Sequence, residues 1–232
     1  INSKMVQAAE PTFSLANMTS LAQQCSDDGE NIPVDQFCEL LESIVLLLRG
    51  MGSMMSTAFS DVAEKAEIMR RNKKFMLELL QKAHAISLNA TIDEEIALGV
   101  IECNGDNNKK KLDKSKYISW EGTYNSTGRN LVRMWWLTKF LTKLLDNLIN
   151  QHNLSLVSSC QDAYTAGFAD HHPWLVRKGA GLAMMAAGQK EALIAKWGVT
   201  NVEEARPALE HFTKLRDQLH QLLSSRNLLD LP

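Results

Sequence analysis

The 232-residue sequence lacks the features that mark several common classes of protein. Its formal net charge is only −2, so it has no basic excess of the kind that general nucleic-acid binders carry. Its apolar runs, such as Ile44 to Leu48, are far too short to span a bilayer. The first residues show no charged segment followed by an apolar one, so we expect no secretory signal. These absences predict a cytoplasmic protein that does not bind nucleic acid.

Motifs for metal binding and for covalent catalysis are also missing. None of the four cysteines belongs to a C-x-x-C pair, and their spacing fits neither a zinc site nor a dense disulfide framework. Scattered thiols in a chain of this size indicate a reducing compartment. The sequence has no Gly-rich phosphate loop, no metal-ligand cluster and no G-x-S-x-G motif. We therefore expect no metal and no other cofactor.

Helical periodicity dominates, and no segment shows the alternation of a strand with turn residues at both ends. The segment "IPVDQFCELLESIVLLLRG" predicts an amphipathic helix that begins near Pro33 and ends at Gly50. Residues 55–87 predict one long helix or two consecutive ones, and Thr91 is the expected cap of the next helix. A polar stretch at 103–128 predicts a long surface loop. Further helices are expected at 129–150, 156–170, 173–187, 190–197 and 201–225.

This pattern predicts an all-α single domain of about eight helices over residues 13–232. Residues 1–12 are interpreted as a flexible N-terminal segment, and Ile1–Lys4 fits a cloning remnant. The helix at 129–150 is nearly apolar all round, so it is expected to lie at the centre of the domain.

Two arginines stand at the start of this central helix. Arg129, Arg133, Trp136 and Phe140 are spaced i, i+4, i+7 and i+11, so they lie along one stripe. Cations at a helix N-terminus oppose the helix dipole, so we expect a compensating group close by. A phosphate or sulfate fits a guanidinium well, because it can accept two hydrogen bonds side by side. The alternative is that the arginines pair with acids such as Asp162 or Asp170.

Two other stretches carry residues suited to binding. Asp61 and Lys65 are spaced i, i+4, and the plain interpretation is a surface ion pair on a helix. His172 lies at or near the N-cap of a helix that opens at Pro173, where a neutral imidazole is favoured. It can donate from one nitrogen and accept at the other, although an incidental cap or packing role is the alternative. His171 is the weaker candidate.

The remaining charges and the methionines have plainer interpretations. The basic stretches at 70–74 and 109–116 predict solvated charge, with attraction to an anionic membrane surface as the alternative. Most methionines are expected to fill the core, while Met184 and Met185 are candidates for an adaptable apolar pocket.

Taken in order, these stretches resemble the glycolipid transfer protein superfamily, and within it the ceramide-1-phosphate transfer branch that includes the plant accelerated-cell-death carrier. The resemblance rests on Asp61-x-x-x-Lys65, Arg129-x-x-x-Arg133, "CQDAY…HHPWLVR" and the terminal "LLDLP". It extends from about Val34 to Pro232. It implies a two-layer all-α sandwich with a buried pocket for lipid tails, which removes a single sphingolipid from a membrane.

The resemblance also implies a role for each site residue. Asp61 would accept hydrogen bonds from the amide and hydroxyl of ceramide, and His172 would hold the amide carbonyl. Lys65, Arg129 and Arg133 would bind the phosphate. Members that carry sugar headgroups have a tryptophan at the position of Arg133, so a phosphate is favoured here.

Two departures from the family pattern concern the headgroup site. The Gly105–Asn125 insert is longer and more polar than the usual connection. Met134 and the two tryptophans follow Arg133, where relatives often carry another basic residue.

The resulting hypothesis is a monomeric, non-enzymatic carrier of ceramide-1-phosphate that touches membranes transiently, with Trp136 and Phe140 leading toward the lipid tails. The alternatives are binding or sensing of another phosphate-headed lipid, such as phosphatidic acid or sphingomyelin, and glycolipid transfer. An enzyme that uses Asp61, Lys65 and His172 as acid–base groups is a further alternative.

Overall fold

The computed structural model describes residues 12–27, 29, 31–78, 81–84, 86–104 and 124–231. Within these residues the chain is all-α, as predicted, and its β pairing is limited to isolated bridges. The α-helices are α1 (Leu15–Asp27), α2 (Val34–Gly50), α3 (Ser53–Ala58), α4 (Asp61–Glu78), α5 (Leu88–Ala97), α6 (Thr127–Asn150), α7 (Leu156–Gly167), α8 (Trp174–Met185), α9 (Lys190–Lys196) and α10 (Arg206–Ser224). Two 3₁₀ helices complete the set, η2 (Ala169–His171) and η3 (Val202–Ala205).

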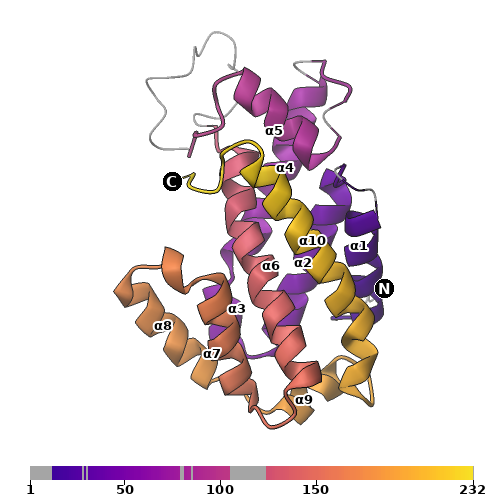
Figure 1. Cartoon of the computed structure of the whole chain (residues 1–232), viewed down its shortest axis with the longest axis vertical. Helices are drawn as coiled ribbons and strands as arrows, with labels where there is room; N and C mark the ends of the chain where they lie inside the picture. The colour runs from indigo at the N-terminus through magenta and orange to yellow at the C-terminus, as the bar shows by residue number, and fades with distance from the viewer. Residues whose placement is uncertain are drawn as a thin grey trace, which may run out of the picture.

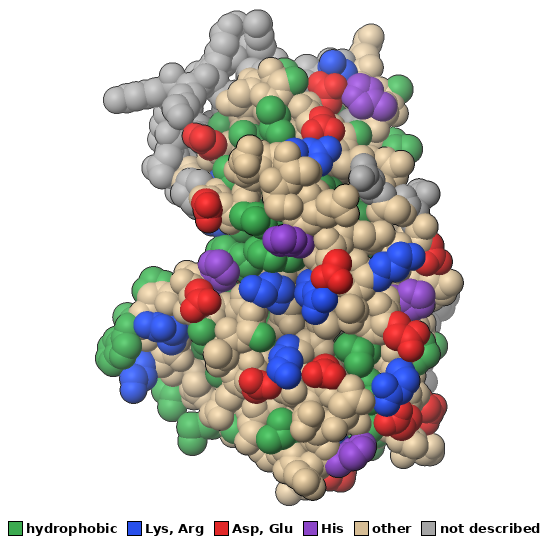
Figure 2. Space-filling view, in the orientation of Figure 1, with side chains coloured by type: hydrophobic (Ala, Val, Ile, Leu, Met, Phe, Trp, Pro, Cys, Tyr) green, Lys and Arg blue, Asp and Glu red, His purple; other side chains and the backbone are tan. Residues whose placement is uncertain are grey.

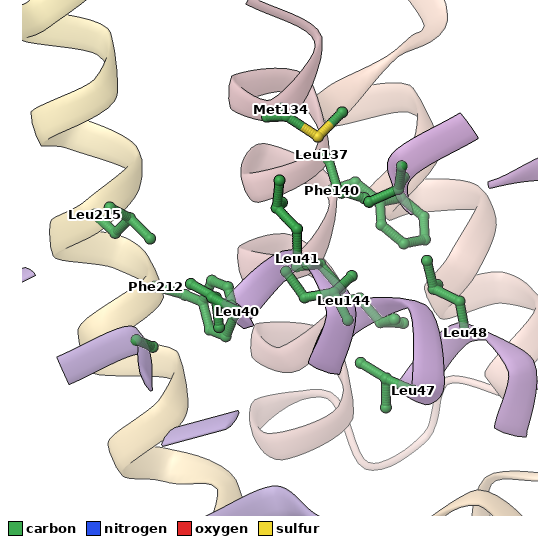
Figure 3. Packing of buried hydrophobic residues seen from close by; sticks show 14 of the residues in the cluster. Leu40, Leu41, Leu47, Leu48, Met134, Leu137, Phe140, Leu144, Phe212 and Leu215 are labelled. Atoms are coloured by element: carbon green, nitrogen blue, oxygen red, sulfur yellow. The ribbon is translucent and has the colours of Figure 1, made fainter. Parts of the chain in front are cut away.

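Helix α6 is the centre of the fold. Sixteen of its 24 residues are buried, which confirms the prediction of a central helix. In Figure 1, α6 and α10 run side by side in front of α2 and α4, so the helices form two layers. Figure 3 shows leucines of α2 between side chains of α6 and α10; the labelled residues are Leu40, Leu41, Leu47, Leu48, Met134, Leu137, Phe140, Leu144, Phe212 and Leu215. Burial of each such side chain contributes about 1.5–3 kcal/mol, so this apolar layer fixes the position of α6.

A glycine brings α7 unusually close to α6. A Cβ added at Gly167 would lie 2.7 Å from the carbonyl oxygen of Trp136 and 2.9 Å from the Cβ of Phe140. Backbone atoms cannot yield in the way that the end of a side chain can, so only glycine permits this approach. As a result, the segment that follows α7, with its two histidines, is held beside α6.

Most predicted helices are present, with shifts at their ends. The segment predicted as one or two helices forms two, α3 and α4, separated by the turn at Phe59–Ser60. Helix α6 begins at Thr127, two residues earlier than predicted, because the Ser126 side chain caps it. Helix α1 was not predicted, although it lies in the expected 13–232 domain.

The prediction that Thr91 caps a helix is wrong. Helix α5 begins at Leu88, with Ser87 at the N-cap, and Thr91 lies inside the helix. The reason is that Leu88 is fully buried, so the apolar packing of α5 begins a turn before Thr91. The predicted loop is described only at its two ends, where Asn104 and Asn125 form a bridge. Residues 105–123 lie outside the described part of the chain, as do residues 1–11.

Cys25, Cys38 and Cys160 are buried thiols. Burial raises the pKa of each of them to about 12, so they stay protonated near neutral pH. Thiols in this form are poor nucleophiles, so these cysteines are packing residues.

Candidate functional site: a cationic helix start beside an apolar cavity

The first turn of α6 is held by side chains from two directions. The Ser126 hydroxyl accepts a hydrogen bond from the backbone N–H of Arg129 at 3.1 Å. The carboxylate of Glu95, on α5, accepts from the N–H of Thr127 at 2.6 Å and from that of Gly128 at 2.9 Å. The free N–H groups at the start of a helix need such acceptors, and a negative charge is favoured there. Glu95 therefore satisfies the N–H groups of the turn that carries the two arginines, and the sequence analysis missed it.

Glu95 lies entirely inside the protein. It also accepts hydrogen bonds from the Tyr124 hydroxyl at 2.8 Å and from the Asn72 side-chain amide at 3.3 Å. Burial raises its pKa to about 7, and the hydrogen bonds from Gly128 and Thr127 oppose that rise. The carboxylate thus joins α4, α5 and the start of α6.

The arginine pair occupies the turn that Glu95 holds. Arg133 donates from Nη1 to the backbone carbonyl of Arg129 at 2.9 Å and to that of Leu231 at 3.3 Å. Burial lowers the pKa of both guanidinium groups, and the charge of Arg129 lowers that of Arg133 further. Among the described residues no carboxylate forms an ion pair with Arg133. Two partly desolvated cations side by side make a site that favours an anion.

The alternative prediction is that acids such as Asp162 or Asp170 pair with the arginines. Asp162 does not, because it has other partners. That carboxylate binds Lys143 at 3.3 Å and the Asn147 amide at 2.9 Å. Asp170 is placed in η2, where its charge acts on the neighbouring His171.

Asp61 and Lys65 form the predicted ion pair on the first turn of α4. Asp61 is exposed, whereas the side chain of Lys65 is largely covered. The charge of Asp61 also acts to raise the pKa of His172, so these two residues from distant segments lie near each other. Lys65 is therefore held by Asp61, and this ion pair lies on the side of the site near His172.

The two histidines have different partners. His172 is half-buried, and its Nδ1 lies 2.8 Å from the hydroxyl of Tyr164. Burial, followed by the charge of His171, lowers the pKa of His172, so its ring is neutral near neutral pH. His172 directly precedes Pro173, the N-cap of α8, which agrees with the prediction that it lies at or near that cap.

His171, the weaker candidate, connects the segment after α7 with the arginines. Its ring stacks on Trp136 with centroids 3.9 Å apart and planes within 4° of parallel. The guanidinium carbon of Arg133 lies 5.4 Å from the centroid of the same tryptophan. Arg133, Trp136 and His171 therefore form one layered cluster.

An apolar cavity of about 510 Å³ begins at His172. Its walls come from α3, α6, α7 and α8, and they include Phe59, Phe140, Tyr164, Phe168, Ala180 and Met184. Phe140 and Met184 therefore line a cavity, in the manner predicted for them. Trp136 differs from the prediction, because its ring is stacked on His171 rather than exposed to the cavity. Met185 also differs, since 67% of it is exposed to solvent.

Figure 2 shows a notch in the outline of this face, above the part of the molecule that carries α7 and α8. Hydrophobic and histidine side chains gather at the notch, and Lys and Arg side chains lie just below it. The polar and apolar parts of the site are therefore neighbours at the surface.

Within the described residues, no group of three His, Cys, Asp or Glu side chains is placed to hold a metal ion. None of the described helices combines the length and the apolar character needed to cross a bilayer.

Comparisons with known proteins identify the family and support the fold. The family model described as glycolipid transfer protein (GLTP) matches residues 32–199 of the chain. The ceramide-1-phosphate transfer protein of Homo sapiens is 25% identical over 232 residues, which cover 97% of this chain and 99% of that protein. The crystal structure of mouse ceramide-1-phosphate transfer protein in its apo form matches with a TM-score of 0.76 and 23% identity, over 95% of this chain and 100% of that one. The human protein in complex with 12:0 ceramide-1-phosphate matches with a TM-score of 0.75 and 21% identity, over 96% of this chain and 100% of that one. Because the family model covers well over half of the sequence, this chain belongs to the glycolipid transfer protein family.

Proposed function

We propose that this protein carries ceramide-1-phosphate between membranes without covalent chemistry. The observation that carries the proposal is the direct succession of a cationic helix start, a neutral histidine and an apolar cavity. A phosphorylated sphingolipid has the same succession of a phosphate, an amide and long tails. The names of the similar proteins support this choice of ligand.

The arginine pair and Lys65 hold the phosphate. A phosphomonoester carries about −1.5 to −2 charges near neutral pH, by analogy with phosphoserine, so several cations are needed to match it. Arg133 uses Nη1 for its two backbone contacts, which leaves its Nε and Nη2 donors for the phosphate oxygens.

The ceramide amide lies between Asp61 and His172. A carboxylate only accepts hydrogen bonds, so Asp61 suits the amide N–H and the hydroxyl of the lipid. The Tyr164 hydroxyl can donate to the Nδ1 of His172, and in that tautomer the ring proton lies on Nε2, which can donate to the amide carbonyl. The two residues thereby recognise the amide from opposite sides.

The apolar cavity takes the tails. A chain of about 15 methylenes left in water would cost about 12 kcal/mol, at about 0.8 kcal/mol per methylene. The charged hydrogen bonds of a headgroup, at about 1.5–3 kcal/mol each, do not offset that cost. A carrier therefore needs an enclosed apolar space, and this one opens beside the headgroup residues.

Helix α8 forms the contact with the membrane. Trp174, Leu175 and Leu182 are 63%, 74% and 61% exposed, although all three are large and apolar. Lys178 lies 5.5 Å above the Trp174 ring, a combination suited to the interface between headgroups and acyl chains. Since the same helix lines the cavity through Val176 and Ala180, docking it brings the cavity to the bilayer.

Two cations of the basic stretch at 70–74 form ion pairs within the protein, so we do not assign the membrane contact to them. Arg70 pairs with Glu42 and Glu67, and Lys73 pairs with Asp35. The loop lysines at 109–116 lie outside the described residues. We place the protein in the cytoplasm, as a monomer that visits membranes through α8.

Transfer between vesicles tests the proposal. Donor vesicles carry fluorescent ceramide-1-phosphate, galactosylceramide or phosphatidic acid, and a catalytic amount of protein is added with an excess of acceptor vesicles. We expect ceramide-1-phosphate to move fastest. Binding without movement would show a sensor instead of a carrier, and faster movement of galactosylceramide would contradict the assignment of the ligand.

A further inference from the structure

Glu95 combines complete burial with contacts to several segments at once. Its Oε1 accepts from the Thr127 N–H at 2.6 Å and from the Tyr124 hydroxyl at 2.8 Å, and its Oε2 accepts from the Gly128 N–H at 2.9 Å. Asn72, on α4, adds a longer contact at 3.3 Å and also donates to the Thr127 hydroxyl at 3.0 Å. Both oxygens are thus occupied by donors from other parts of the chain.

Such a carboxylate is costly as a simple core residue. A buried charge is destabilising unless hydrogen bonds compensate it, and apolar residues of similar size often replace buried charges without loss of stability. Two backbone N–H groups point at Glu95 from the start of a helix, so an acceptor is needed at this position. The carboxylate therefore serves the geometry of the helix start.

The helix start is also where the arginines are attached. The N–H of Arg129 is bound to Ser126, whose hydroxyl donates to the Ile101 carbonyl at 2.6 Å. The guanidinium of Arg133 is bound in turn to the carbonyl of Arg129. Glu95 thus holds Thr127 and Gly128, Ser126 holds the next residue, Arg129, and the backbone of this turn connects these contacts to the arginine pair.

The charges at the start of α6 also favour a carboxylate at the position of Glu95. Two guanidinium groups at a helix N-terminus oppose the helix dipole and repel each other, so the turn would relax by moving them apart. A carboxylate at the helix N-terminus opposes the first of these effects, and with a pKa of about 7 Glu95 is largely ionised at pH 8. No other buried carboxylate lies at this turn among the described residues.

We propose that Glu95 is a positioning residue for the phosphate site: its carboxylate fixes the first turn of α6, and thereby holds the guanidinium groups of Arg129 and Arg133 together before a lipid arrives. The inference rests on the proposed function, because it assigns the arginines to a lipid phosphate. Glu95 itself does not touch the lipid.

The test compares Glu95→Gln with Glu94→Gln. Gln keeps the shape of the side chain but presents an NH₂ group to one of the two backbone N–H donors, so one hydrogen bond is replaced by a repulsion. Glu94 is the adjacent residue on α5, and it binds Lys82 and His84 instead of α6. The affinities of both variants and of the wild type are measured for ceramide-1-phosphate and for ceramide, which lacks the phosphate, at about pH 8, where the phosphate is doubly charged.

We expect Glu95→Gln to bind ceramide-1-phosphate roughly tenfold more weakly, with ceramide affinity within about twofold of the wild type. Glu94→Gln should keep both affinities. Equal losses for the two lipids would overturn the inference, because they would show that Glu95 supports the fold as a whole. Unchanged affinity for ceramide-1-phosphate would overturn it as well.

A second variant keeps the test decisive if Glu95→Gln does not fold. Tyr124→Phe removes one donor to the carboxylate and retains the ring, which packs against Phe75 with centroids 6.2 Å apart. A smaller loss confined to ceramide-1-phosphate is expected, and an equal loss for both lipids contradicts the inference. The proposed function fails separately, if the wild type does not distinguish the two lipids.

Discussion

The helices α6 and α8 both border the site, but they are held in opposite ways. Sixteen residues of α6 are buried, and its first turn is fixed by Ser126 and Glu95. Only Ala183 and Met184 are buried on α8, which leaves most of its large apolar side chains in solvent. Under the function proposed above, this difference is a division of labour, in which a fixed helix presents the headgroup site and a lightly held helix covers the tail cavity.

The largest expected effect concerns the fixed side. Gly167→Ala places a methyl group against the backbone of α6, where the Trp136 carbonyl is 2.7 Å away. We expect this overpacking to lower the free energy of unfolding by about 3 kcal/mol, measured by urea denaturation. Gly181→Ala on α8 is the matched control, since nothing lies within 4 Å of the added Cβ and a slight stabilisation is expected. Similar effects at the two positions would break the contrast between the helices.

A substitution that fills the cavity should show how much of the binding depends on the lipid tails and how much on the headgroup. Ala180→Phe introduces a ring into the space between α3 and α8. We expect transfer of long-chain ceramide-1-phosphate to fall roughly 100-fold, because the tails then remain in water. Binding of a 2:0 ceramide-1-phosphate should fall less, because it has one long chain instead of two to place in the cavity. If both lipids were lost equally, the cavity and the headgroup site would not be independent.

The amide contact predicts a loss that depends on the lipid. Asp61→Val removes the acceptor for the amide and hydroxyl, so transfer of ceramide-1-phosphate should fall by roughly 30-fold. Phosphatidic acid has neither donor and should be affected much less. The comparison uses the same vesicles for both lipids, and an equal loss would count against the role of Asp61.

A smaller effect is expected at the membrane. Trp174→Ala removes the largest exposed side chain at the start of α8, and binding to vesicles should weaken roughly tenfold. Ile96→Ala is the control, because Ile96 is also exposed, at 41%, but lies on α5. Sedimentation with vesicles measures both variants, and a comparable loss for Ile96→Ala would argue against docking through α8.

The smallest effect is a pH dependence that involves His172. Burial and the neighbouring His171 lower its pKa in the folded state, while Asp61 opposes the shift. An unfolded histidine takes up a proton near pH 6.5, so the unfolded state binds more protons just below that pH and stability falls as the pH drops. His172→Asn should reduce this fall between about pH 7.5 and about pH 5.5. Denaturation curves of both proteins at the two pH values measure it, and an identical fall in both would contradict the assignment.

The sequence was informative where periodicity and residue type decide the structure. It located α2, α6, α8 and α9 to within about two residues, and it placed α6 at the centre because that stretch is apolar on nearly every side. It also paired Asp61 with Lys65, since the i, i+4 spacing fixes their proximity on any helix.

Contacts between distant segments were not predictable in the same way. Glu95 looked like one of several acids in "IDEEI", and only the packing of α5 against α6 turns it inward. His171 looked weaker than His172, because its stacking on Trp136 depends on how closely Gly167 lets α7 approach α6. Trp136 itself lies on the expected helix, but the ring belongs to the cationic cluster and not to the cavity wall.

The most direct test of the division of labour is the transfer of ceramide-1-phosphate and of galactosylceramide by the wild type and by Arg133→Leu. The account predicts fast transfer of ceramide-1-phosphate by the wild type, and a loss of roughly 100-fold in the variant, because a phosphate left without its bidentate partner is poorly held. Slow transfer of galactosylceramide should be unchanged or improved. Transfer of ceramide-1-phosphate at an undiminished rate by Arg133→Leu would show that the arginine is structural and would contradict the account.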